Sequence, residues 1–108
     1  MVMATRKQIN SFGRRLVREY RPEKVVLFGS YANGHPNADS DVDILVVMPF
    51  EGNPVDRQVD MRMKLRPEFP IDLLVRSPSK IRERLEMGDD FIKDILDHGV
   101  VLYETHDT

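Results

Sequence analysis

The sequence predicts an α+β domain, and three observations support this. Short apolar runs typical of strands alternate with segments in which apolar residues recur every three or four positions, the spacing of an amphipathic helix. Clusters of proline, glycine and asparagine separate these segments. The 108 residues match the common size of one domain, and no internal repeat or linker divides them. We therefore expect residues 1–108 to form a single domain.

The amino-terminal half is predicted to form one long helix and two strands. Apolar residues recur at helical spacing over Arg6–Tyr20, and Pro22 ends this helix. Apolar runs at Lys24–Phe28 and Asp41–Met48 predict two strands. The segment between the strands, residues 33–40, is dense in turn-forming residues and predicts a loop.

The carboxyl-terminal half is predicted to contain three helices and two strands. A helix over about 55–65 has an apolar face formed by residues four positions apart, namely Val55, Val59 and Met63. A second helix begins at Pro78 and a third at Asp89 or the next residue. The third helix is expected to bury its apolar residues, which are Phe91, Ile92, Ile95 and Leu96. The strands are expected at residues 71–75 and 100–103.

Composition excludes several classes of protein. Hydrophobic residues make up 41% of the chain and charged residues 31%, which is ordinary for a soluble globular protein. No apolar run approaches the roughly 20 residues of a membrane span, and the first residues lack the apolar stretch of a secretory signal. The absence of cysteine excludes disulfides and zinc–thiolate sites. We expect a cytoplasmic protein that does not bind a membrane.

The charges are distributed unevenly along the chain. The net charge of −2 does not indicate a nucleic-acid-binding protein. Six basic residues nevertheless lie within residues 1–21, whereas seven acidic residues follow from Glu86 onward. Two readings remain open: two solvated helix faces of opposite sign, or a basic helix that attracts a nucleotide or another polyanion.

Asp41 and Asp43 stand at the start of the second predicted strand. Residues i and i+2 of a strand project from the same face, so the two carboxylates point to one place. Two neighbouring carboxylates repel each other and are costly to bury, so the pair indicates a divalent metal ion that would neutralise their negative charge. Mg²⁺ prefers oxygen ligands and often binds one or two carboxylates together with substrate phosphates. Alternatively, Asp41 and Asp43 are ordinary polar residues on the solvent-exposed side of the strand where it begins.

Two further features complete the candidate site. Gly29 and Ser30 follow the first strand, where glycine permits close backbone approach and amides with a serine hydroxyl can hold phosphate. Asp72 lies inside a short apolar strand; if this strand lies beside the second one, three carboxylates meet. Two metals could then clamp an in-line displacement at phosphorus, with Asp72 as metal ligand and general base. Alternatively, Asp72 caps its strand or pairs with Arg76.

Two motifs resemble the signature of the minimal nucleotidyltransferase domain, within the DNA polymerase beta-like superfamily. They are Leu27-Phe-Gly-Ser-Tyr-Ala-Asn-Gly34 and Asp39-Ser-Asp-Val-Asp-Ile-Leu-Val46. The resemblance extends from Val25 to about Glu104. It implies a mixed sheet with helices packed on one face, a nucleoside triphosphate at Gly29 and Ser30, and Mg²⁺ at Asp41, Asp43 and Asp72.

The resemblance also implies an activity and a partner. The activity is Mg²⁺-dependent transfer of a nucleoside monophosphate, AMP from ATP, to an acceptor hydroxyl with release of pyrophosphate. The partner is a helical HEPN-type toxin, with this chain as its antitoxin. A catalytically inert binding module that neutralises its partner by contact is the alternative. The sequence leaves open the acceptor, the preferred base, binding of nucleic acid and formation of a homo-oligomer.

One residue departs from the family pattern. Many relatives carry arginine or lysine where this chain has Asn33, which cannot offer a positive charge to phosphate. Lys24, Arg76 or a partner's arginine could supply that charge, or turnover is slow. The loop residue His35 is expected to be exposed. His98 is expected at a helix carboxyl terminus, where a histidine interacts favourably with the helix dipole.

Overall fold

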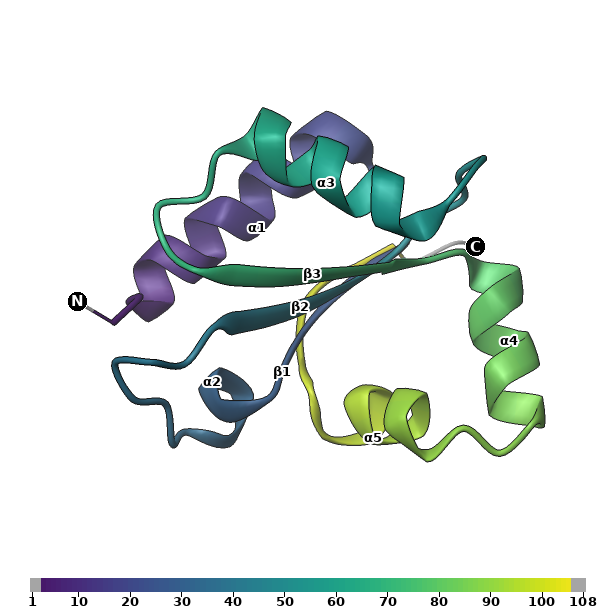
Figure 1. Cartoon of the computed structure of the whole chain (residues 1–108). Coiled ribbons are helices and arrows are strands. Elements are labelled where there is room, and N and C mark those ends of the chain that lie inside the picture. Colours follow the sequence, from purple (N-terminus) through teal and green to yellow (C-terminus); the bar gives the residue numbers. More distant parts are fainter. Residues whose placement is uncertain (1–2, 106–108) are drawn as a thin grey trace.

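The computed structural model describes residues 3–105 and consists of five helices and four strands within that range (Figure 1). In chain order these are α1 (Arg6–Tyr20), β1 (Lys24–Phe28), α2 (Ser30–Asn33), β2 (Val42–Val47), α3 (Pro54–Leu65), β3 (Ile71–Arg76), α4 (Pro78–Glu86), α5 (Asp90–His98) and β4 (Val100–Glu104). The predicted α+β class is confirmed. The predicted limits of α1, α3 and the four strands agree with the structure to within one residue, and the short helix α2 extends to Asn33, the first residue of the predicted loop.

Local capping explains where the helices begin. The Thr5 hydroxyl accepts a hydrogen bond from the Gln8 backbone N–H, and Gln8 Oε1 accepts one from the Thr5 backbone N–H. Ser77 caps α4 by accepting from the Lys80 N–H, and Asp89 caps α5 by accepting from the Ile92 N–H. These bonds satisfy backbone donors that a helix start otherwise leaves without partners.

The four strands form one mixed sheet in the order β3-β2-β1-β4. β1 is antiparallel to both β2 and β4, whereas β2 and β3 are parallel and α3 provides the crossover between them. The mixed sheet is thus confirmed. Its register aligns Asp43 of β2 with Asp72 of β3, and Phe28 of β1 with Asp43.

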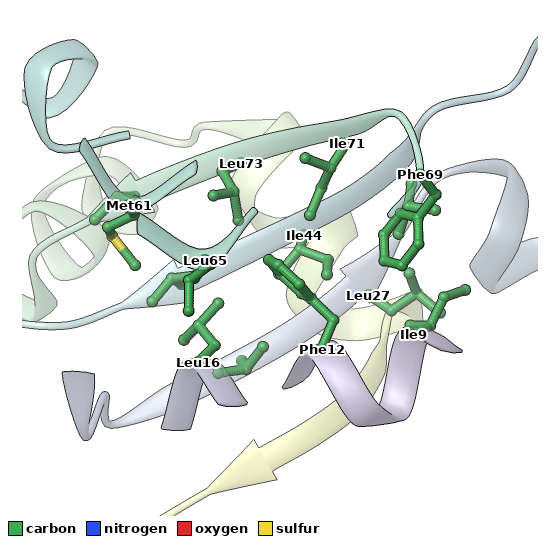
Figure 2. Packing of buried hydrophobic residues seen from close by; sticks show 14 of the residues in the cluster. Ile9, Phe12, Leu16, Leu27, Ile44, Met61, Leu65, Phe69, Ile71 and Leu73 are labelled. Atoms are coloured by element: carbon green, nitrogen blue, oxygen red, sulfur yellow. The ribbon is translucent and has the colours of Figure 1, made fainter. Parts of the chain in front are cut away.

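The main core lies between one face of the sheet and the helices α1 and α3 (Figure 2). Phe12 is buried at the centre of α1, and its ring packs edge-on against Phe69 with centroids 5.7 Å apart. The other labelled members come from α1, α3 and the strands, and include Ile9, Leu16, Ile44, Met61, Leu65 and Leu73.

A second apolar cluster covers the opposite face, so the expectation of helices on one face holds only for α1 and α3. Figure 1 shows α5 on the side of the sheet away from α1 and α3. There, Ile92 and Ile95 of α5 and Ile81 of α4 pack with three strand residues, Val26, Leu45 and Val47. The physical reason is that β1 and β2 have consecutive buried residues. A strand that is apolar on both sides must be covered on both sides.

The predicted apolar face of α3 is wrong. Val55, Val59 and Met63 are 61%, 39% and 69% exposed, whereas Met61 and Leu65 are buried in the core. The helix is oriented by this second pair, which is also four positions apart. Phe91 of α5 likewise differs from expectation, because it is 57% exposed rather than buried. No helix within residues 3–105 combines the length and apolar character that a membrane crossing requires.

Candidate functional site

The turn after β1 brings the backbone against a carboxylate. Gly29 has φ 73° and ψ −153°, a combination essentially restricted to glycine, and its carbonyl accepts bonds of 3.0 Å from the Ala32 and Asn33 N–H groups. A Cβ atom at position 29 would lie 2.2 Å from Oδ2 of Asp43. The residue after β1 must therefore be glycine, because the main chain passes where a side chain would displace Asp43.

Asp43 and Asp72 are neighbours across the parallel pair of strands. They are aligned in register, so their side chains leave the same face of the sheet. Asp41 lies just outside β2, two residues before Asp43. Asp43 is half-buried, while Asp41 and Asp72 are exposed. The structure thus aligns Asp43 with Asp72 on one face of the sheet and places Asp41 at the entry to β2.

The electrostatics identify Asp43 as the centre of this group. Burial first, and then the negative charges of Asp72 and Asp41, raise the pKa of Asp43 above its ordinary value. On the same face of β2, Leu45 and Val47 are buried against α5, so Asp43 marks the end of an apolar surface. A cation beside Asp43 would relieve both the repulsion and the burial.

Asp72 is not the buried residue that the sequence indicated. β3 is an edge strand, and Asp72 lies exposed on it. It does not pair with Arg76 within residues 3–105, where Arg76 Nη1 donates instead to the Val75 carbonyl at 2.8 Å and to Gln58 Oε1 at 3.3 Å. Burial therefore does not explain Asp72, and its position opposite Asp43 becomes its main distinguishing feature.

The fit to a metal ion can be tested on the donor set. Within residues 3–105, no three histidine, cysteine, aspartate or glutamate side chains gather closely enough to hold a metal ion. The exposed side chains of Asp41 and Asp72 would have to turn toward Asp43 to complete a ligand shell. The aligned residues Asp43 and Asp72 both carry carboxylate oxygens, the donors that Mg²⁺ prefers. The donor chemistry therefore fits this ion, whereas the described side chains do not form a closed ligand set.

A cavity of about 290 Å³ adjoins Gly29 and Asp43. Its far wall is α5, which contributes Phe91, Asp94 and His98 at spacings of three and four residues. The Phe91 ring packs edge-on against Phe28, with centroids 5.9 Å apart. The sequence interpretation did not assign these α5 residues to the site. Their helical spacing was readable, but their position opposite Gly29 depends on how α5 packs on β1.

The two intramolecular cations suggested for the phosphate site lie elsewhere. Lys24 stands at the other end of β1 from Gly29 and forms an ion pair of 3.0 Å with Glu104. Arg76 is aligned with Val47, at the far end of β2 from Asp43. Neither residue can therefore replace a basic side chain at position 33. Asn33 itself lines the cavity.

Comparison with known proteins identifies the family of the chain. A sequence model described as the nucleotidyltransferase domain matches residues 7–102. The chain belongs to the nucleotidyltransferase domain family. It is therefore an enzyme of the nucleotidyltransferase class, as the resemblance of the two motifs predicts.

Two relatives from Methanocaldococcus jannaschii, both described as candidate protein adenylyltransferases, are similar along much of their length. One is 32% identical over 105 residues, covering 94% of this chain and 100% of the relative. The other is 30% identical over 78 residues, covering 72% of this chain and 76% of the relative. The similarity thus includes the whole length of the first relative.

Solved structures share the fold. A candidate nucleotidyltransferase from Sulfolobus solfataricus superimposes with a TM-score of 0.62 at 23% identity, covering 91% of this chain and 78% of that one. A mutant of the toxin–antitoxin MntA-HpeT gives a TM-score of 0.60 at 20% identity, with coverage of 90% and 74%. A toxin–antitoxin with AMP-PNP gives 0.57 at 20% identity, with the same coverage. At these identities the likeness concerns the fold alone.

Proposed function

We propose that this nucleotidyltransferase transfers AMP from ATP to a hydroxyl group of a partner protein, acting as the antitoxin of a helical HEPN-type toxin. The observation that carries the proposal is the alignment of Asp43 with Asp72, beside a Gly29 whose backbone touches Asp43. The relative that is 32% identical supports a protein acceptor. The structural neighbours support a toxin–antitoxin setting and an adenine nucleotide.

Each residue has a defined role in the proposed reaction. The turn at Gly29 and Ser30 would hold the triphosphate through its backbone amides and the Ser30 hydroxyl, and the missing side chain at position 29 leaves room for the Asp43 carboxylate beside it. Asp41 and Asp43 would hold Mg²⁺, with Asp72 as third ligand, and the bound ion would neutralise charge on the phosphates. Asp43 and Asp72 would also be ligands of a second metal ion in the proposed two-metal site. Little covalent chemistry is required of the protein beyond positioning.

The bond changes follow from this arrangement. The acceptor oxygen forms a bond to the α-phosphorus of ATP, and the bond from that phosphorus to the oxygen bridging to the β-phosphorus breaks. Pyrophosphate leaves with the electron pair. The hydroxyl proton passes to the Asp72 carboxylate, which lies on the side of Asp43 away from β1, so that the acceptor would approach from that side.

The open surroundings of Asp72 favour a macromolecular acceptor. Asp72 is exposed on an edge strand and borders a shallow groove with Val55 and Val59 of α3. Small-molecule pockets usually bury most of their ligand, whereas this groove has a volume of only about 80 Å³. A protein that docks against the edge could enclose the site and supply the hydroxyl.

Labelled ATP tests the reaction type. The partner protein, Mg²⁺ and enzyme are incubated with ATP labelled at either the α- or the γ-phosphorus. We expect label in the partner only from the α position. The Asp41→Asn, Asp43→Asn double variant should transfer none, while Asp39→Asn, an exposed acid of the preceding loop, should act as wild type. Absence of α-label in every candidate acceptor would refute the transferase proposal.

A second candidate is an inert module that neutralises its partner by contact. The uncharged Asn33 in the cavity favours it, because triphosphate sites usually contain a basic side chain. Expression of the Asp41→Asn, Asp43→Asn variant beside the toxin separates the two functions. Loss of protection supports catalysis, whereas full protection shows that contact is sufficient.

A further inference from the structure

The cavity beside Gly29 and Asp43 contains one basic side chain among its described lining residues, that of His98. The other charged groups that line it, Asp43 and Asp94, are acidic. A nucleoside triphosphate would bring several more negative charges to this cavity. Since charge-assisted hydrogen bonds are the strong contacts to phosphate, a donor from the protein is needed here.

The topology shows which part of the nucleotide would face His98. In the order β3-β2-β1, Asp72 and Gly29 lie on opposite sides of Asp43. In-line displacement places the attacking and leaving oxygens on opposite sides of phosphorus. With the acceptor on the Asp72 side, the leaving pyrophosphate lies on the β1 side. That is the side of the cavity and of α5.

The carboxyl end of α5 is held firmly against β1. Ile92 and Ile95 are buried against the sheet. Gly99, directly after His98, approaches β1 so closely that a Cβ there would lie 2.4 Å from Val26 Cγ1 and 2.9 Å from the Leu27 carbonyl oxygen. Leu27 is two residues from Gly29. The backbone that carries His98 is therefore fixed close to the Gly29 turn.

The imidazole of His98 is oriented by its own helix. Its Nδ1 lies 2.9 Å from Oδ1 of Asp94, one helical turn earlier. In the imidazolium form both ring nitrogens carry a proton, so Nδ1 donates to Asp94 and Nε2–H remains to donate to a ligand. Both side chains are exposed at the mouth of the cavity, with accessibilities of 72% and 75%, so a nucleotide can reach them.

We propose that His98 donates a hydrogen bond from Nε2 to a β- or γ-phosphate oxygen of the bound nucleoside triphosphate, with Asp94 as the residue that positions the ring. The assignment rests on the proposed function, because it assumes that a triphosphate binds at Gly29. It gives His98 the role of phosphate-binding residue in a cavity whose position 33 is uncharged.

Calorimetric titration of the full chain, in the presence of Mg²⁺, tests the assignment with three probes: ATP, inorganic triphosphate and AMP. We expect His98→Ala to lower the affinity for ATP and for inorganic triphosphate about ten-fold, equivalent to about 1.4 kcal/mol of binding free energy. AMP, which lacks the β- and γ-phosphates, should bind as before. His98→Arg should stay within about two-fold of wild type. Asp94→Asn should reduce the preference for ATP over AMP by a smaller factor.

Two controls make the result specific. His35→Ala removes another exposed histidine that does not line the cavity, and should leave all three affinities unchanged. Asn33→Arg introduced into His98→Ala should restore ATP affinity, because it places a cation in the same cavity.

Two outcomes overturn the assignment in distinguishable ways. In the first outcome, wild-type protein binds ATP, and His98→Ala either binds ATP equally well or loses affinity for AMP as much as for ATP. His98 then does not bind these phosphates, although the proposed function stands. If wild-type protein binds neither ATP nor inorganic triphosphate, the proposed function fails and the assignment with it.

Discussion

Replacing Gly29 by alanine tests the packing on which the site depends. The backbone at φ 73° and ψ −153° lies in a region that side-chain-bearing residues occupy at a cost of about 1–3 kcal/mol. The new Cβ would stand 2.2 Å from Asp43 Oδ2, where an ordinary contact needs at least 3.4 Å. The carboxylate must therefore leave its position, at about 0.5–1.5 kcal/mol for an unfavourable rotamer.

Together these terms predict a loss of about 2–4 kcal/mol in the free energy of unfolding. For a domain of this size about 1 kcal/mol corresponds to roughly 4–8 °C, so Tm should fall by about 8–32 °C. Binding of Mg²⁺-ATP should also be lost, since Asp43 is displaced. Differential scanning calorimetry with and without Mg²⁺-ATP measures both effects.

Gly52→Ala is the matched control. Gly52 also has a positive φ, 88°, but a Cβ there would meet no atom within 4 Å. This variant should lose about 1–2 kcal/mol from backbone strain and keep its ligand-induced rise in Tm. The reasoning is refuted if Gly29→Ala melts no lower than Gly52→Ala and is still stabilised by Mg²⁺-ATP.

Three further predictions concern the carboxylates and the core. The raised pKa of Asp43 means that the folded state holds this proton more tightly than the unfolded chain, whose value is near 3.8. Ionisation of Asp43 therefore lowers stability as pH rises from that value through the raised pKa. Asp43→Asn should have a higher Tm than wild type at pH 7, and this difference in Tm should vanish below about pH 4. A difference in Tm that stays constant from about pH 4 to pH 7 would contradict the raised pKa. Asp72→Asn should reduce turnover by about 10²- to 10⁴-fold, as expected for a lost general base, and should keep an ATP affinity within a few-fold of wild type. An unchanged rate in a single-turnover assay would show that Asp72 is not the general base. Phe12→Ala should destabilise the domain by about 3–5 kcal/mol in urea unfolding, because the ring is buried against Phe69. Val55 is exposed, so Val55→Ala should change the free energy of unfolding by less than about 0.5 kcal/mol. Similar values for the two variants would contradict the packing.

Sequence patterns predict the elements well where local chemistry decides. The limits of α1 follow from Thr5, Gln8 and the proline after it, all within a few residues of the helix ends. The face that a helix buries is a tertiary property. On α3, Val55, Val59 and Met63 form as regular a stripe as Met61 and Leu65, and only packing against the sheet and α1 selects the second set.

The candidate site shows the same division. Strand geometry predicts that Asp41 and Asp43 share a face, whereas in the structure β2 begins only after Asp41. The adjacency of Asp43 and Asp72 follows once β2 and β3 are known to pair in parallel register. The contribution of α5 does not follow from any local pattern. His98 reaches the cavity because a glycine after it allows the helix to close against β1, a contact between segments some 70 residues apart.

The proposed function requires Asp41, Asp43 and Asp72 to gather around a divalent cation next to a triphosphate at Gly29. A crystal structure with Mn²⁺ and a non-hydrolysable ATP analogue, using the anomalous signal of the metal, tests this most directly. We expect an anomalous peak bound by the Asp41 and Asp43 carboxylates, with the β- and γ-phosphates against the turn at Gly29 and Ser30. A nucleotide bound elsewhere, or a metal that none of these three carboxylates contacts, would contradict the account.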